Sequence, residues 1–255
     1  MTSFSSHYDG FISHAGSDTD TGENVKGLCA YPLYQEAKKQ KLRFFLDREN
    51  LKLTAPSWEI LRALAVSKVG IVIISKAFWD GITNTPVSRP WCLLELRVLL
   101  ARHKLYLNKS VKAKVKELSR LFIVVMEPVH IDWFCPPKKL PLVEPSMLGL
   151  EDMEWTSFRQ LLVEEDPELL VLFDDSELMI STNDIPFVSF EKQHVISDLL
   201  SNVIPRVKSV LELIHEKDTA KFADGRADQA QQIPGSSSQG ISECSSDSHF
   251  QCCVQ

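Results

Sequence analysis

Residues 70–75 read GIVIIS, a run of apolar, mostly β-branched side chains that is too short for a helix and typical of a strand buried on both faces. Residues 8–13 and 121–126 have the same character, and 42–47 and 186–190 are weaker candidates. Helical patterns occupy residues 30–40, 57–67, 91–103, 155–163 and 190–216. Strands that alternate with helices predict an α/β protein with a parallel sheet covered on both faces. Such a sheet binds ligands beyond the carboxyl ends of its strands.

Composition narrows the classes of protein. The 255 residues are 44% hydrophobic and 24% charged, and the net charge of -6 argues against nucleic acid as the main partner, because phosphate binding needs a basic face. The chain has no apolar run near ~18 residues and no signal-peptide core, so we expect a cytoplasmic protein. Six scattered cysteines predict free thiols in a reducing compartment, and their spacing predicts no metal site.

The domain boundary follows a change in composition. We expect residues 1–218 to form one domain, with a long proline-interrupted loop at 128–145 and a kink or break at Pro205 in its last helix. Residues 219–255 are rich in Ser, Gln and Gly, and they predict a flexible tail that buries too little surface to fold.

One charged residue lies on an apolar face of a predicted helix. Glu95 shares a stripe with Trp91, Cys92, Val98 and Leu99 in a segment that is apolar on almost every side. A carboxylate among such neighbours loses hydration, so its proton affinity should rise. Proteins usually tolerate such a group for a partner or a function.

Four motifs lie near the predicted strand ends: YDGFISHAGSD at 8–18, FLDRENL at 45–51, IVIIS at 71–75, and SRPW at 88–91, which leads into WCLLEL at 91–96. In this order and spacing they resemble a TIR (Toll/interleukin-1 receptor) domain. The match covers residues 8–126 closely and residues up to 217 more loosely. The resemblance implies a flavodoxin-like, five-stranded parallel sheet with helices on both faces.

The resemblance also gives Glu95 a role. TIR domains divide into scaffolding adaptors and enzymes that cleave NAD⁺, and the enzymes place a catalytic glutamate at this helix position. NAD⁺ would be the substrate, with no cofactor. Cleaving the nicotinamide–ribose bond expels a neutral leaving group, so the transition state needs negative charge near the ribose and no general acid. The alternatives are a structural pair between Glu95 and Arg102, a cap on a neighbouring loop, or a non-enzymatic adaptor that acts by TIR–TIR association.

The same resemblance suggests substrate contacts. Trp91 would stack on the nicotinamide ring, Phe45 and Trp58 would contact a base, and His14 and Gly16 would meet the phosphates or a ribose. Each tryptophan has a structural alternative, because Trp91 and Trp58 would also serve as apolar anchors of their helices. A histidine after a strand, like His14, is commonplace.

The C-terminus carries a second signal. The last four residues, CCVQ at 252–255, fit a C-a-a-X box with Cys252 as the prenylated residue, although a chance cysteine pair is the alternative. A lipid there would allow membrane association. The loop KLTAP at 52–56 lacks the glycine that is usual there in TIR domains, and this predicts a different turn. In many TIR domains the corresponding loop forms assembly contacts.

Overall fold

The computed structural model describes residues 8–16, 24–47, 56–109, 119–183, 185–190 and 196–230. The elements, with η1 a π-helix and η3 a 3₁₀-helix, are β1 (Gly10–His14), η1 (Lys26–Ala30), α1 (Tyr31–Lys39), β2 (Phe44–Phe45), α3 (Pro56–Val66), β3 (Val69–Ile74), α4 (Lys76–Thr83), α5 (Pro90–Lys109), β4 (Leu121–Met126), η3 (Ile131–Phe134), β5 (Lys138–Lys139), α6 (Pro145–Leu148), α7 (Asp152–Glu165), α8 (Pro167–Asp174), β6 (Met179–Ile180), β7 (Phe187–Phe190) and α9 (Ile196–Ala230).

The main sheet has five parallel strands in the order β2-β1-β3-β4-β7. Renumbered along the chain, this is the 2-1-3-4-5 order of flavodoxin-like folds. The predicted fold class is therefore confirmed, and each predicted strand is present, although β2 is only two residues long. A separate antiparallel pair, β5 and β6, lies in the part of the chain between β4 and β7.

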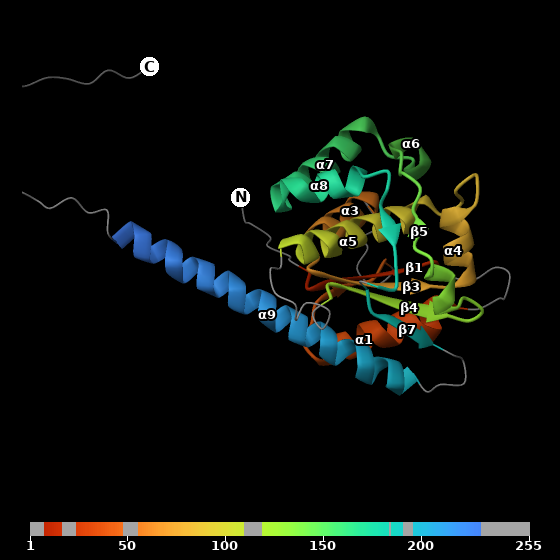
Figure 1. The fold of residues 1–255 in the computed structure, drawn as a ribbon, viewed down its shortest axis with the longest axis horizontal. Helices are drawn as coiled ribbons and strands as arrows, with labels where there is room; N and C mark the ends of the chain where they lie inside the picture. The colour runs from red at the N-terminus through yellow and green to blue at the C-terminus, as the bar shows by residue number, and fades with distance from the viewer. Residues whose placement is uncertain are drawn as a thin grey trace, which may run out of the picture. The chain divides into compact units, whose positions relative to one another are not determined.

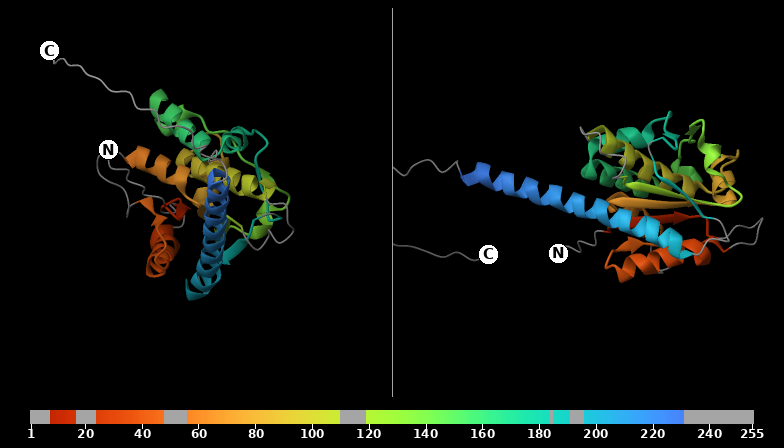
Figure 2. Two further views of the ribbon diagram at one scale, coloured as in Figure 1. Left: turned by 90° about the vertical axis from the view of Figure 1, so that its left-hand side faces the viewer. Right: turned by 60° about the horizontal axis from the view of Figure 1, so that its bottom comes forward.

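Side chains of the central strands alternate between two cores. Residues such as Phe11 and Val72 belong to the core beneath α3, α5, α7 and α8, which we call the α5-side core. Their neighbours Ile12 and Ile71 belong to the core beneath α1 and the part of α9 that ends at Ile214, which we call the α1-side core. Figures 1 and 2 show α3 and α5 on one face of the sheet and α1 on the other. This arrangement is the period-two pattern of a sheet buried on both faces.

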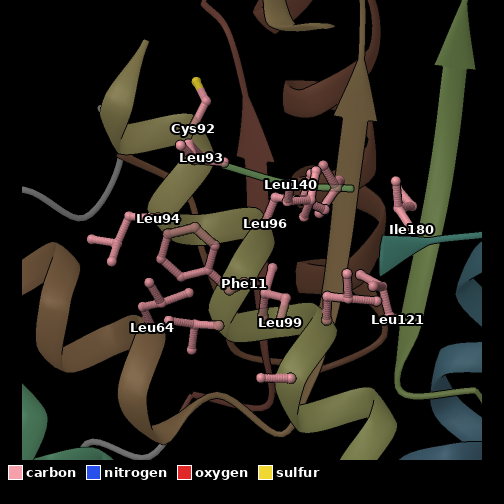
Figure 3. Packing of buried hydrophobic residues seen from close by; sticks show 14 of the residues in the cluster. Phe11, Leu64, Cys92, Leu93, Leu94, Leu96, Leu99, Leu121, Leu140 and Ile180 are labelled. Carbon is pink, nitrogen blue, oxygen red and sulfur yellow. The ribbon is translucent and has the colours of Figure 1, made fainter. Parts of the chain in front are cut away.

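Helix α5 is buried around nearly its whole circumference, as its apolar sequence predicts. It approaches β3 closely, because a Cβ on Gly70 would lie 2.8 Å from the side chain of Leu99. Figure 3 shows Leu93, Leu94, Leu96 and Leu99 spread around the helix, with Phe11 of β1 among them. Any charged residue in the buried part of α5 must therefore find its partners inside the protein.

Arg97 meets this requirement with four backbone carbonyls. Its side chain is fully buried, and its two terminal nitrogens donate to Leu140 and Pro141 (3.2 and 2.9 Å) and to Phe173 and Asp175 (2.5 and 2.8 Å). Burial lowers the pKa of the guanidinium, and nearby carboxylates oppose this effect. Arg97 thus ties α5 to the segment before α6 and to the end of α8.

Three features differ from the sequence prediction. Helices α4 and α8 were not predicted, and the expected loop at 128–145 contains η3 and β5. Helix α9 runs through Pro205 without the predicted break, and it continues to Ala230 although a flexible tail was expected from residue 219. The chain forms two compact units, Met1–Ile214 and His215–Gln255, and residues 231–255 lie outside the described part.

Replacing Arg97 with Met should destabilise the protein strongly. The change leaves four carbonyls, two of them buried and two partly buried, without their donor, and we expect a loss of ~3–5 kcal/mol in the free energy of unfolding, measured by urea denaturation. Arg159→Met is the matched control, because Arg159 makes a bidentate pair with Asp174 at the surface (2.7 Å for both bonds). Its loss should cost less than ~1 kcal/mol. Equal costs for the two variants would show that Arg97 is not a structural clamp.

Candidate functional site

The topological switch point of the sheet lies at the carboxyl ends of β1 and β3. After β1 the chain forms α1 and joins the sheet again as β2, on one side of β1. After β2 it forms α3 and joins the sheet as β3, on the other side of β1. Helices α1 and α3 cover opposite faces of the sheet, so a crevice is expected where these two connections diverge. This is the place where α/β proteins of this type bind their ligands.

Glu95 reaches this point from α5. Its Oε2 accepts a hydrogen bond from Ser13 Oγ at 2.5 Å, and Ser13 is the next-to-last residue of β1. The side chain of Glu95 is partly buried, and loss of hydration raises its pKa to about 8. The Ser13 hydrogen bond opposes this rise, while the negative charge of Asp47 adds to it. Glu95 is therefore mostly protonated at neutral pH.

Two further contacts fix the register of α5 against the end of β1. Arg89 Nη1 donates to the Ala15 carbonyl at 2.6 Å, and Cys92 Sγ lies 3.7 Å from the His14 carbonyl. Arg89, Cys92 and Glu95 are three residues apart in turn, so they lie along one side of the helix. Their partners are Ala15, His14 and Ser13, so the order of the contacts along α5 is the reverse of the order along β1. Burial keeps Cys92 a thiol by raising its pKa.

The opposite side of β1 carries a second polar group. His14 is buried, its Nδ1 accepts the Gly16 N–H at 2.8 Å, and its Nε2 lies 3.6 Å from Asp47 Oδ1. Lys26, at the start of the π-helix η1, forms an ion pair with the same Asp47 oxygen. Because Nδ1 accepts a hydrogen bond, a neutral His14 carries its proton on Nε2, facing Asp47. The half-exposed Asp47 carboxylate is thus held by two buried groups.

Gly16 is required by the backbone. It has φ of +78°, and a Cβ at this position would meet nothing within 4 Å, so conformation rather than space selects glycine. Its carbonyl accepts the Lys26 N–H at 3.1 Å, which joins the end of β1 to η1.

The structure moves Phe45 out of the predicted site. Its ring is 1% exposed, stacks on Phe11 with centroids 5.1 Å apart and receives the edge of Tyr8 at 5.4 Å. The ring has no face open to a substrate, so its predicted contact with a base is not supported. Phe45 is instead part of the α5-side core, together with Phe11 of β1.

The two tryptophans lie in different surroundings. Trp91 is partly buried one turn before Glu95 and packs against the α5-side core, in keeping with both roles considered for it. Trp58 also packs on that core, and together with Met153, Glu154 and Ser157 of α7 it lines a pocket of about 210 Å³. That pocket includes none of the residues at the end of β1.

Arg102 is not the partner of Glu95. Its guanidinium donates to the carbonyls of Leu64, Ala65 and Ser67 at the end of α3. Among the described residues, the only hydrogen bond of the Glu95 side chain is the one from Ser13. The structural pair considered from sequence is therefore wrong, and Arg102 has a structural role of its own.

The site thus brings together Glu95, His14 and Gly16 from the prediction, and adds Ser13, Lys26 and Asp47. Ser13 could have been recognised as a hydroxyl on the same face of its strand as Phe11. Nothing in the sequence signals the pairing of Lys26 with Asp47.

The remaining sequence predictions concern the loop before α3, the C-terminal cysteine, metal ligands, free thiols and membrane spans. Residues 52–55 of the loop before α3 and Cys252 lie outside the described residues. In the part that is described, no group of three or more His, Cys, Asp or Glu residues is arranged to hold a metal ion. The free thiols found there are Cys29, Cys92 and Cys135. None of the described helices has the length and apolarity to cross a membrane.

Fold and site together define a flavodoxin-like α/β domain with a protonatable carboxyl group at its switch point. No family model and no curated protein matches the chain. Among solved structures, it is similar to the TIR domains of the activated Roq1 resistosome directly recognizing the pathogen effector XopQ, with 18% sequence identity and a TM-score of 0.38. The alignment covers 79% of this chain and 98% of that chain. The fold assignment rests on strand order and register.

Protonation of Glu95 should make stability depend on pH. The pKa rises from 4.5 to about 8 on folding, so the folded state holds a proton that the unfolded state releases between these values. The contribution of Glu95 to stability should be greatest below about pH 4.5 and fall by up to ~1.4 kcal/mol per pH unit towards about pH 8. Glu95→Gln should lack this slope and be more stable than wild type above about pH 8.

Urea denaturation across this range measures the effect. Glu164→Gln, which changes an exposed carboxylate of α7, is the control and should keep the wild-type slope. A constant difference between wild type and Glu95→Gln at every pH would mean that Glu95 does not titrate in this range.

Proposed function

We propose that this chain is a TIR-type NAD⁺ glycohydrolase in which Glu95 promotes cleavage of the nicotinamide–ribose bond. The observation that carries the proposal is the Glu95 carboxyl group, held by Ser13 at the switch point of a flavodoxin-like sheet. An ionisable group whose pKa is shifted this far by burial is a candidate for a functional role. The sequence motifs also support the proposal, because they resemble those of NAD-cleaving TIR domains, which carry a catalytic glutamate at the helix position of Glu95.

The chemistry needs little more than a positioned negative charge. Nicotinamide leaves as a neutral molecule, and positive charge develops on the ribose as the C–N bond breaks. An ionised Glu95 near the ribose stabilises that charge and accepts hydrogen bonds from the sugar hydroxyls. Trp91, one turn earlier on α5, is the proposed stacking partner for the nicotinamide ring.

Substrate charge explains how a carboxyl group that is neutral in the free protein can act as an anion. The nicotinamide ring of NAD⁺ is cationic, and a cation near a carboxyl group favours its ionised form. Binding would therefore lower the pKa of Glu95 from about 8 and release its proton. The free protein avoids a poorly hydrated charge, and the complex gains an ion pair.

The wider context of the proposal comes from the TIR resemblance. It includes self-association through TIR–TIR contacts, a role in immune or cell-death signalling, and membrane association through a lipid on Cys252. None of these is needed for the chemistry at Glu95.

Release of nicotinamide from NAD⁺ by purified, concentrated protein tests the activity. We expect release by wild type and a fall in kcat of about 10²–10³-fold in Glu95→Gln, which keeps the shape of the side chain but not its charge. Glu164→Gln, which changes an exposed carboxylate of α7, should behave as wild type. No release by wild type, even when clustered on a surface, would favour the adaptor alternative.

The pH dependence gives a second, sharper test. Because kcat/KM reports groups of the free enzyme, it should rise roughly tenfold per pH unit up to about pH 8 and then level off. The profile of kcat reports the complex, and its pKa should be lower because the cationic ring is bound. A kcat/KM that is flat between about pH 5 and about pH 8 would contradict the role of Glu95 as an ionised carboxylate.

A further inference from the structure

Ser13 is a buried hydroxyl in a strand that is otherwise apolar on the same face. It is 1% exposed, and the residues two positions before and after it, Phe11 and Ala15, belong to the α5-side core. Serine hydroxyls in such places commonly bond to a nearby carbonyl, as Ser67 does with Ala63 at 2.7 Å. Ser13 instead donates across to the carboxyl group of Glu95. Its partner is therefore the carboxyl group that the proposed reaction uses.

The hydrogen bond makes the two oxygens of Glu95 different. Oε2 accepts from Ser13, and no other hydrogen bond to Glu95 occurs within the described ranges, so Oε1 is the oxygen left for a ligand. The contacts of Arg89 and Cys92 with the end of β1 fix the helix, but they do not fix rotation of the Glu95 carboxyl group. That rotation is restrained by Ser13.

We propose that Ser13 is a positioning residue, whose hydroxyl holds Oε2 of Glu95 and thereby presents Oε1 to the ribose of the substrate. The proposal rests on the function proposed above, because Glu95 is taken as the reacting carboxylate. Ser13 itself does not touch the reacting atoms. Its effect is to set the orientation and the charge of the group that does.

The charge effect follows from the direction of the bond. When Glu95 is neutral, Ser13 donates to Oε2 and the carboxyl proton lies on Oε1. When Glu95 is ionised, the same hydrogen bond becomes charge-assisted and stronger, so Ser13 lowers the pKa of Glu95. The other titratable groups that act on Glu95 and on the neighbouring Cys92 are Asp47, Cys92 and Arg89. All three residues are still present when Ser13 is substituted.

The first experiment follows the Glu95 carboxyl carbon by NMR in protein labelled with ¹³C-glutamate. The signal is assigned by its absence in Glu95→Gln, and it needs no enzymatic activity. In Ser13→Ala the pKa of Glu95 should rise by about one to two units, because a hydrogen bond to the ionised form is lost. Ser13→Thr keeps the hydroxyl and should stay close to wild type. If Ser13→Ala does not fold, Ser13→Cys replaces a good donor with a weak one and should raise the pKa in the same direction.

Ser67→Ala is the matched control, because it removes a serine with the same 1% exposure that bonds to a carbonyl rather than to Glu95. It should leave the Glu95 titration unchanged. An unchanged pKa in folded Ser13→Ala or Ser13→Cys, or an equal rise in Ser67→Ala, would overturn the proposal.

The second experiment compares kcat and KM for nicotinamide release. Loss of orientation should lower kcat about tenfold or more in Ser13→Ala with a smaller change in KM, and Ser13→Thr should restore it. Unchanged kcat in an active protein would overturn the positioning role. If wild type releases no nicotinamide but the pKa rises in Ser13→Ala, the hydrogen bond acts on Glu95 as described and the proposed function fails instead.

Discussion

Helix α5 is buried on nearly all sides, and every charged group in its buried part must be satisfied from within the protein. Arg97 has four carbonyl acceptors from the segment before α6 and the end of α8. Arg102 has three at the end of α3. Glu95 has one donor, Ser13 of β1. The helix is thus tied to the surrounding layers through its charges as well as its leucines.

The number of partners separates these three charges by role. A guanidinium with three or four acceptors is close to satisfied, and its position serves the fold. A carboxyl group has room for several donors, so Glu95 with a single one is left under-satisfied at the edge of the sheet. Loss of hydration on burial is the main cause of its raised pKa. Arg97 and Arg102 are thus committed to backbone carbonyls and hold the fold together, whereas Glu95 is the charged group of α5 that the proposed function uses.

How far the sequence predicts this arrangement depends on the kind of information that each prediction needs. Hydrophobic period identified the strands, the two-faced sheet and the misplaced charge of Glu95, because burial leaves a repeating pattern in the chain. It did not identify the partner of Arg97, since carbonyl acceptors leave no trace in side-chain identity. Phe45 was predicted to face a ligand, yet its ring is buried, because a residue at a strand end can turn either way. Pro205 was expected to kink or break its helix, and α9 continues through it, although a proline there removes one hydrogen bond and crowds the carbonyl four residues earlier.

The alternation of β1 explains how one short strand serves both halves of the site. Ser13 faces α5 and Glu95, whereas the next residue, His14, faces η1 and reaches Asp47 together with Lys26. Asp47 in turn raises the pKa of Glu95 from the far side of the strand end. Lys26 and His14 hold that carboxylate in place, so they act on Glu95 through it. Asp47 already pairs with Lys26 and His14, so Glu95 is the acidic group left for an incoming cation. Under the proposed function, a cationic ring favours the ionised form of Glu95 and an uncharged ring of the same shape does not, so we expect the site to select for charge before shape.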